Sequence, residues 1–426
     1  MSLQFVFGPS GGGKSYYLYE KIIEEAKKDR TKDFLLIVPE QFTMQTQKEL
    51  VERSQNHAIM NIDVLSFERL AFRVFDELGM YQIRILEETG KNLILRRLTE
   101  EYGDSMSVLG SNLKKMGYVS EIKSLISEFM QYQITPKDIE AWCEDEDNAW
   151  SFRLKMKDIL VIYRKFLEYL EGSYITSEEV LEECAKTAGR SVMLKDCNLI
   201  FDGFTGFTPV QVNLLKTLFP MTDRVWAAVT LDKRVDPYRV TGMQELFHMS
   251  QKMVRTLLEL ADEAKCEVLE PIWVEDGRQY RYGNAKALLH LEENLFRSSL
   301  KAYPKEQEEI QIQSCQNRKE ELEFAAATIS RMVREEDYRY RDFAIVSGAA
   351  AEYANYVKEI FEAYGIPYFI DEKKTILFHP FIEFLRASLE MVEEDFSYES
   401  VMRYFRSGLS RPVSYTHLTL PTICSV

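Results

Sequence analysis

The sequence predicts an α/β protein with a parallel sheet, a helical insertion within the sheet-forming chain, and a truncated second α/β domain. Two runs, FLLIV at 34–38 and NLIFDGF at 198–204, contain the continuous apolar stretches typical of strands buried on both faces of a parallel sheet. Strands and helices alternate along the first 70 residues, which indicates right-handed crossovers. From about 80 to 190 this alternation stops, and the composition becomes typical of helices.

The first α/β segment begins with an apolar, β-prone run and a glycine-rich loop. The expected order is a strand at 3–7, a helix at Lys14–Arg30, a strand at 34–38, a helix at Phe42–Arg53 and a strand at 62–67. The next segment contains a single proline, Pro136, and apolar spacings such as Leu93, Leu95 and Leu98 that suit amphipathic helices. We therefore interpret 81–190 as an all-helical insertion.

The sheet pattern then returns. Strands are expected at 198–204 and 224–231, and helices at about 243–263 and 284–299. Residues 1–80 and 191–300 would thus form one split domain. A partial second α/β domain at 301–411 is expected to contain strands at 310–315, 342–348 and 367–370 and helices at 319–335 and 350–364.

Residues 412–426 do not fit this organisation. Their sequence, PVSYTHLTLPTICSV, resembles a translated sequencing-adapter read-through, and we interpret it as a non-native tail; a native tail is the alternative. The second α/β domain is also unfinished at this point. We therefore expect the natural protein to continue beyond it.

Composition narrows the class of protein. The 426 residues carry a net charge of −15, which argues against bulk electrostatic binding of nucleic acid as the main activity, although a local groove could still be basic. We find neither a signal peptide nor a run of 18 uncharged apolar residues, so we expect a cytoplasmic protein without a membrane segment. The six cysteines form no C-x-x-C pair, and the five histidines form no H-E-x-x-H motif; neither set indicates a site.

The strongest motif is GPSGGGKS, which fits the phosphate-loop pattern G-x-x-x-x-G-K-[ST] between a strand and a helix. Its glycines allow backbone N–H groups to surround phosphate oxygens, and the following helix directs its positive end to the same place. Lys14 would contact the β- and γ-phosphates, and Ser15 would bind magnesium. The predicted nucleotide-binding residues are Gly8, Pro9, Ser10, Gly11, Gly12, Gly13, Lys14 and Ser15. A glycine-rich turn without a nucleotide is the alternative.

A phosphate loop also needs an acid at the end of a neighbouring strand. Asp202, which follows the apolar run of NLIFDGF, is the candidate for an outer-sphere magnesium contact. The alternative is a turn residue at the end of a strand. ATP and magnesium are therefore the expected cofactors.

Five blocks carry a family resemblance: GPSGGGKS, VPEQFTMQTQKEL (38–50), VLSFERLAFRVF (64–75), LIFDGFTGFTPVQ (199–211) and NRKEELEFAAATI (317–329). Together they resemble the B subunit of the ATP-dependent helicase/deoxyribonuclease of the AddAB/RexAB type, over residues 1–411. The resemblance implies a superfamily-1 helicase-like body that reads DNA beside a motor A subunit, in a heterodimer that processes double-strand ends for recombinational repair. It also implies a nuclease domain and an iron–sulfur cluster in a C-terminal part that cannot be placed here.

The chain departs from helicase-type ATPases at the residue after Asp202, where a glutamate usually positions the attacking water. That residue is Gly203, and no other carboxylate follows within FDGFTGFTPVQ. We therefore expect nucleotide binding with weak or absent hydrolysis, and a fragment that is inactive alone. Two alternatives remain open: a phosphate-loop small-molecule kinase, and a non-catalytic structural partner with a relic nucleotide site.

The resemblance also suggests where DNA would bind. Gln41 and Thr43 could cap a helix and bond a phosphate, with a plain N-cap as the alternative. Arg69 and Arg73 share a helical face and could meet phosphates, or simply face solvent. Weaker basic candidates are Lys114, Lys115, Arg153, Lys155 and Lys157. Nearby apolar residues are expected in the core rather than stacked on bases: Leu65, Phe67, Leu70, Phe72 and Phe75.

Overall fold

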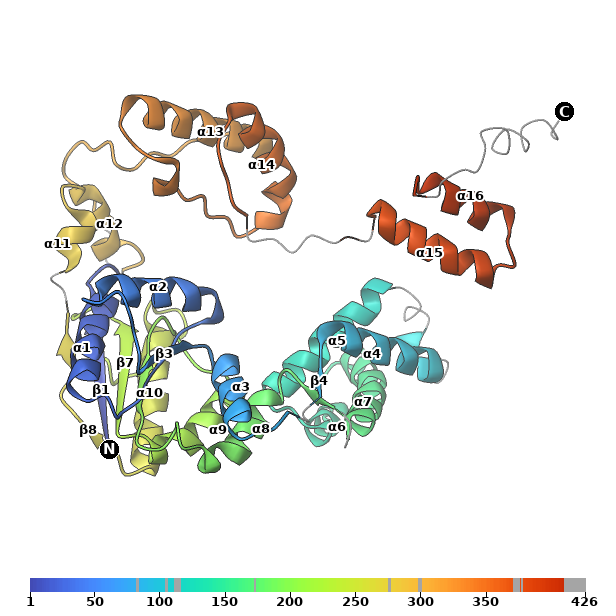
Figure 1. Cartoon of the computed structure of the whole chain (residues 1–426), viewed down its shortest axis with the longest axis horizontal. Coiled ribbons are helices and arrows are strands. Elements are labelled where there is room, and N and C mark those ends of the chain that lie inside the picture. The colour runs from blue at the N-terminus through green and yellow to red at the C-terminus, as the bar shows by residue number, and fades with distance from the viewer. Residues whose placement is uncertain are drawn as a thin grey trace. The chain divides into compact units, whose positions relative to one another are not determined.

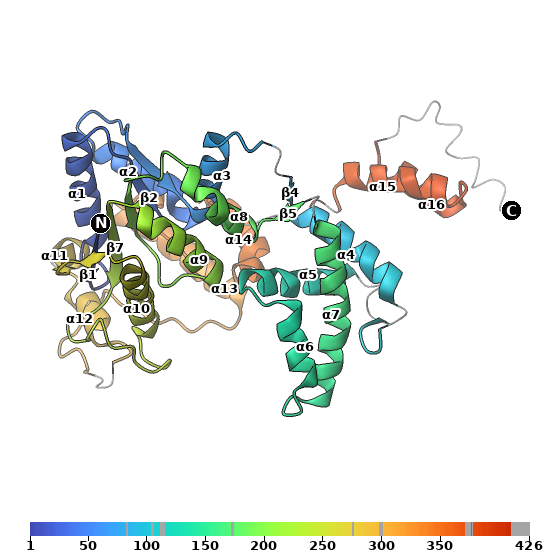
Figure 2. The same ribbon diagram turned by 90° about the horizontal axis from the view of Figure 1, so that it is seen from below.

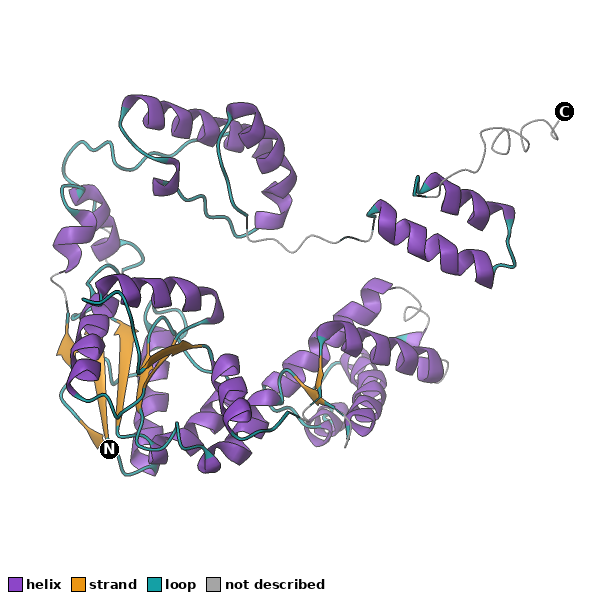
Figure 3. Cartoon of the chain, viewed as in Figure 1, coloured by secondary structure: helices purple, strands orange, loops and turns teal. Residues whose placement is uncertain are grey.

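The computed structural model describes residues 1–409 except 82–83, 104–105, 111–115, 172–173, 275–276, 298–300, 371–375 and 377. The chain divides into two compact units, Met1–Ile310 and Gln311–Val426. All strands of the described part lie in the first unit (Figure 3).

The first unit is built on a parallel sheet, as the alternating pattern predicted (Figure 1). In the described residues the sheet has seven strands in the order β3-β2-β6-β7-β1-β8, with β9 also paired to β1. The strands are β1 (Ser2–Gly8), β2 (Phe34–Ile37), β3 (Ile62–Leu65), β6 (Asn198–Phe201), β7 (Arg224–Thr230), β8 (Glu267–Val268) and β9 (Ile272–Trp273). In register, Leu36 lies opposite Ile200, and Phe5 opposite Ala227.

Helices cover both faces of the sheet (Figures 1 and 2). Inward residues of α1 (Lys14–Lys28) and α2 (Thr43–Arg53), such as Leu18 and Leu50, form one core with Val6, Leu36 and Ile200. The opposite core contains Phe7, Leu35 and Phe201 and is covered by four other helices. These are α3 (Phe67–Glu77), α8 (Val180–Thr187), α9 (Pro209–Leu218) and α10 (His248–Glu263). Successive strand residues thus serve opposite cores, which explains why the strands are apolar throughout.

Four helices of the inserted segment share a separate core, which includes Leu95, Ile126, Ile139 and Phe166. They are α4 (Glu88–Tyr102), α5 (Met116–Gln131), α6 (Pro136–Glu144) and α7 (Trp150–Leu170). A short parallel pair, β4 (Ile85–Leu86) and β5 (Ile175–Thr176), joins the two ends of the insertion. Helix α8 lies within the range 81–190, but its residues Val180 and Cys184 belong to the sheet core.

Several element boundaries differ from those expected. The strand expected at 62–67 ends at Leu65 because the Ser66 hydroxyl accepts a hydrogen bond from the Arg69 amide and caps α3. The strand expected at 198–204 ends at Phe201. The helix expected at 284–299 is present but shorter, as α12 (Lys286–Asn294), and a short helix that was not expected, α11 (Gly277–Tyr282), precedes it. The helix expected at 243–263 begins at His248.

The second unit contains α13 (Arg318–Glu335), α14 (Ala350–Tyr364), α15 (Pro380–Glu393) and α16 (Tyr398–Arg406). Helices α13 and α14 pack through a small core that includes Leu322, Ile329 and Phe361. The strands expected at 310–315, 342–348 and 367–370 are wrong, because these segments form no strand ladder. Their apolar residues Ile312, Val346 and Phe369 are exposed. A β-prone segment forms a strand only when it pairs with a neighbouring strand and packs its side chains, and these three residues do neither. The tail at 412–426 lies outside the described residues.

Candidate nucleotide site

The glycine-rich loop lies where the sequence placed it, between β1 and α1. Gly11 and Gly13 have φ angles of +72° and +92°, a backbone region that side chains rarely adopt. Gly8 and Gly12 are required for a different reason: an added Cβ would lie 2.2 and 2.7 Å from the Val274 carbonyl oxygen. The loop is thus a narrow cradle that ends at the N-terminus of a 15-residue helix, a geometry suited to phosphate.

Lys14 is the first residue of α1, and its Nζ donates a hydrogen bond to the Pro9 carbonyl oxygen at 2.9 Å. Burial lowers the pKa of Lys14 to about 8; the nearby charge of Asp202 opposes this shift and that of Arg281 reinforces it. An anionic phosphate in the loop would favour the charged ammonium form.

Asp202 directly follows β6, and its backbone N–H donates to the Ile37 carbonyl oxygen of β2. Its carboxylate is nearly buried and accepts a hydrogen bond at Oδ2 from the Tyr19 hydroxyl at 2.8 Å. The parallel sheet therefore brings Asp202 beside Lys14 and Ser15, because the carboxyl ends of its strands share one edge.

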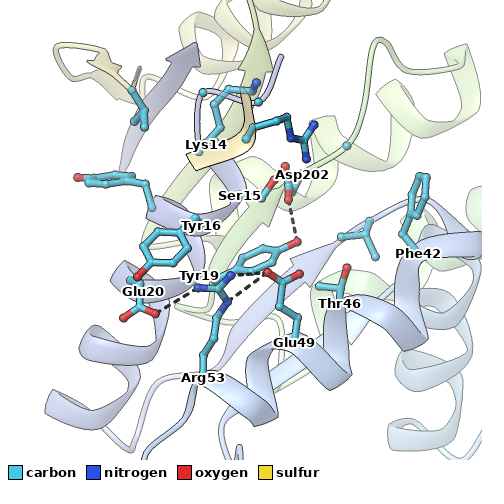
Figure 4. Close-up of a pocket in the computed structure, with 18 of the residues that line it drawn as sticks. Lys14, Ser15, Tyr16, Tyr19, Glu20, Phe42, Thr46, Glu49, Arg53 and Asp202 are labelled. Atoms are coloured by element: carbon cyan, nitrogen blue, oxygen red, sulfur yellow. Dashed lines mark hydrogen bonds and ion pairs between the residues drawn. The ribbon is translucent and has the colours of Figure 1, made fainter. Parts of the chain in front are cut away.

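These groups line one cavity of about 1090 Å³ (Figure 4). It contains Gly11–Ser15 of the loop, Asp202 and Gly203, side chains of α1 and α2, and Val274, Tyr280 and Arg281 from beyond β9. Oxygen ligands and a lysine-containing cradle at a helix N-terminus form a donor set that fits a nucleotide phosphate with magnesium. The part of the chain that the structure describes holds no cluster of three or more His, Cys, Asp or Glu side chains suited to a metal ion.

Sequence reasoning did not identify several residues of this cavity. Tyr19 comes from α1, and Arg281 comes from α11, where its side chain lies over Gly11. Elsewhere in the cavity lining, the Arg53 guanidinium lies 4.2 Å from the centre of the Tyr16 ring and forms ion pairs with Glu49 and Glu20. The spacing of Glu49 and Arg53 on one helix predicts their pairing, but no local pattern links Arg281 to a loop 270 positions earlier.

Gly203, which stands where helicase-type ATPases usually carry a glutamate, has a φ angle of +80°. A Cβ at this position would lie 3.3 Å from Pro39 Cδ. The backbone after Asp202 therefore favours glycine itself and disfavours any residue with a side chain.

The residues predicted to contact DNA are not assembled into a basic surface. The Thr43 hydroxyl donates to the Glu40 carbonyl oxygen at 2.9 Å, and the N-cap of α2 is Phe42, so the expected capping by Gln41 and Thr43 is wrong. Arg69 and Arg73 lie one turn apart on the same face of α3, and both side chains are exposed. Each has an acidic neighbour: Arg69 pairs with Glu40 at 2.9 Å and Arg73 with Asp63 at 3.8 Å.

The apolar residues around these arginines mostly have the predicted role. Phe67, Leu70 and Phe75 are buried, and Leu65 packs against the same core. Phe72 is 41% exposed, so its assignment to the core is wrong. Among the weaker basic candidates Lys155 and Lys157 are exposed on α7, Arg153 is half-buried, and Lys114 and Lys115 lie outside the described residues.

A second hollow of about 360 Å³ is lined by residues of the sheet domain and by Gln131 of the insertion, and it includes Glu40, the ion-pair partner of Arg69. Its charged lining residues are acidic: Glu40, Glu68 and Glu178. Such a lining does not attract phosphate groups.

No helix among the described residues is long and apolar enough to span a membrane. The cysteines at 143, 184, 197 and 266 are buried and that at 315 is half-buried; all five are unpaired thiols.

Comparisons with known proteins identify the family. A family model described as "ADDB, N-terminal" matches residues 5–292. The B subunit of the ATP-dependent helicase/deoxyribonuclease of Lachnoclostridium phytofermentans is 42% identical over 413 residues, covering 96% of this chain and 36% of that protein. The proteins of the same name from Clostridium tetani and Caldanaerobacter subterraneus are 33% and 32% identical, again over 96% of this chain and over 36% and 35% of their own lengths.

The chain thus spans about 36% of the length of the curated relatives it matches. Because the family model covers more than half of its residues, the chain belongs to the AddB family and contains the N-terminal region of that family.

Proposed function

We propose that this chain is the nucleotide-binding part of the B subunit of an ATP-dependent helicase/deoxyribonuclease. The observation that carries the proposal is one cavity that joins Gly11–Ser15 of the loop, Lys14 among them, to Asp202 in a member of the AddB family. The relatives are named as B subunits, so the proposed partner is an A subunit that supplies the motor.

In the proposed complex, the loop amides and Lys14 would bind the phosphates of ATP, and Ser15 and Asp202 would hold magnesium. Magnesium neutralises phosphate charge and fixes the geometry of the triphosphate. Arg281 is placed over the loop and adds a second positive charge to the cradle.

The same cavity supports nucleotide binding better than nucleotide hydrolysis. Gly203 offers no carboxylate to position water, and its backbone disfavours one. The other carboxylates that line the cavity, Glu20 and Glu49, are engaged with Arg53. We therefore propose that ATP binding by this part regulates or stabilises the complex, while the partner subunit performs the mechanical work.

We further propose that the complex acts in the cytoplasm on double-strand DNA ends during recombinational repair. Its nuclease domain and iron–sulfur cluster would lie in the portion of the family that this chain does not cover. Gln41, Thr43, Arg69 and Arg73 remain proposed DNA contacts. For Arg69 and Arg73, the ion pairs with Glu40 and Asp63 would have to open first.

An equilibrium titration with ATP and magnesium tests the proposed nucleotide site. Wild-type protein should bind, and Lys14→Ala should weaken binding by at least about 10-fold, because hydrogen bonds to charged groups contribute about 1.5–3 kcal/mol. Lys28→Ala is the matched control, since it removes the same charge from the exposed end of the same helix. Negligible binding by both wild type and Lys14→Ala would support a relic site instead.

A strand-displacement assay tests the division of labour. The chain alone should unwind no DNA with ATP present. ATP-dependent unwinding by the isolated chain would overturn the proposal that the motor is another subunit.

A further inference from the structure

Tyr19 has a placement that the nucleotide-binding motif does not explain. It lies on α1, five residues after Lys14, and its side chain crosses from the helix to the end of β6 (Figure 4). Its hydroxyl donates to Asp202 Oδ2 at 2.8 Å, and both residues are nearly inaccessible to solvent, with 4% and 7% exposure. Tyr19 is therefore the side chain that fixes one oxygen of the proposed magnesium-binding carboxylate.

The hydroxyl is suited to this contact, because a phenol O–H donates a hydrogen bond and a carboxylate oxygen accepts it. A carboxylate has two oxygens on a rigid plane, so a donor that fixes one oxygen also fixes the direction of the other.

The surroundings of the contact show that it belongs to the cavity. Tyr19, Thr46 and Glu49 all line it together with Asp202, and they come from the two helices on the same face of the sheet. If Tyr19 served only the core, its ring alone would suffice, since it packs with Leu18, Ile22 and other apolar residues there. The hydroxyl is the part that faces the site.

We propose that Tyr19 is a positioning residue for magnesium: its hydroxyl orients the Asp202 carboxylate so that this carboxylate can hold the magnesium ion of the bound nucleotide. The inference rests on the proposed function, since it concerns the same site. It places a hydrogen-bond donor directly beside Asp202.

The test is Tyr19→Phe in the whole 426-residue chain, because this substitution removes the hydroxyl and keeps the ring. ATP affinity is measured by calorimetry with excess magnesium and again with EDTA. Groups that orient metal ligands typically contribute 10–100-fold to metal affinity. We expect Tyr19→Phe to reduce the magnesium-dependent gain in ATP affinity by about 10-fold and to leave the affinity in EDTA unchanged.

Tyr163→Phe is the matched control. Tyr163 is also 4% exposed, and its hydroxyl donates to the Ile134 carbonyl oxygen at 3.1 Å, but it lies in the helical insertion. The control should therefore lose one buried hydrogen bond without any change in ATP affinity in either condition.

A double-mutant cycle keeps the proposal testable if Tyr19→Phe also lowers stability. Asp202→Asn should abolish the magnesium-dependent gain, and adding Tyr19→Phe to it should change that gain no further. Additive effects, an unchanged magnesium dependence in Tyr19→Phe, or an equal loss with magnesium and with EDTA would each overturn the role of Tyr19. Failure of wild-type protein to bind ATP at all would instead overturn the proposed function, and the inference with it.

Discussion

Replacing Gly203 by glutamate restores the residue that helicase-type ATPases usually carry after the magnesium-binding acid. The structure predicts that this change costs stability and does not restore activity. At a φ angle of +80°, a residue with a Cβ is disfavoured by about 1–2 kcal/mol relative to glycine. The new Cβ would also lie 3.3 Å from Pro39 Cδ, so the side chain would begin against this proline.

The free-energy cost corresponds to a melting temperature lower by about 2–8 °C for a domain of 150–250 residues. Thermal unfolding followed by circular dichroism measures it, and a phosphate-release assay measures ATP turnover. Gly203→Ala should show most of the decrease in melting temperature, because the decrease comes from the unfavourable backbone conformation and not from the glutamate side chain. Gly206→Ala is the control, since a Cβ there would meet only Met249 Cε, at an ordinary 3.6 Å. A Gly203→Glu protein that melts like wild type and hydrolyses ATP faster would refute this reasoning.

Two further predictions concern buried charges. Lys91 is 2% exposed and donates hydrogen bonds to Glu88, Glu178 and Ser177, so Lys91→Ala should lower the free energy of unfolding in urea by about 3 kcal/mol. Lys186→Ala, which breaks only exposed pairs, should cost less than about 0.5 kcal/mol, and equal losses would contradict the prediction. Burial alone would raise the pKa of Asp232, but hydrogen bonds and charge from Arg234, with the charge of Arg297, lower it to about 2. This depressed pKa contributes about 2 kcal/mol of stability that is complete above pH 5 and is lost as the pH falls towards 2. In Asp232→Asn, the free energy of unfolding should therefore fall less steeply between about pH 5 and pH 2 than in the wild type. An equally steep fall in both proteins would rule out this contribution.

Long apolar runs made the central sheet predictable, because strands buried on both faces need apolar residues at every position. FLLIV and the apolar part of NLIFDGF became β2 and β6 for this reason. The two-residue strands β4, β5, β8 and β9 were not predicted, since such short pairings leave no periodic pattern. In the second unit the composition predicted strands, but strand formation depends on a partner edge, which a local pattern cannot supply.

In the candidate site, too, some residues could be predicted from a local sequence pattern and others could not. The contiguous loop Gly8–Ser15 was predictable from its motif, and Asp202 from its place after a strand. Tyr19 was not, because a tyrosine five residues along a helix is equally consistent with a core residue. Arg281 could be placed only by the fold, which brings α11 over Gly11.

Hydrogen–deuterium exchange of the chain with and without ATP and magnesium tests the proposed nucleotide site most directly, because it locates binding on the backbone. We expect slower exchange in the peptide containing Gly8–Ser15 when nucleotide is present, together with slower exchange around Asp202. The protection should disappear in Lys14→Ala. Unchanged exchange of Gly8–Ser15 at saturating ATP, or equal protection in Lys14→Ala, would contradict nucleotide binding at this loop.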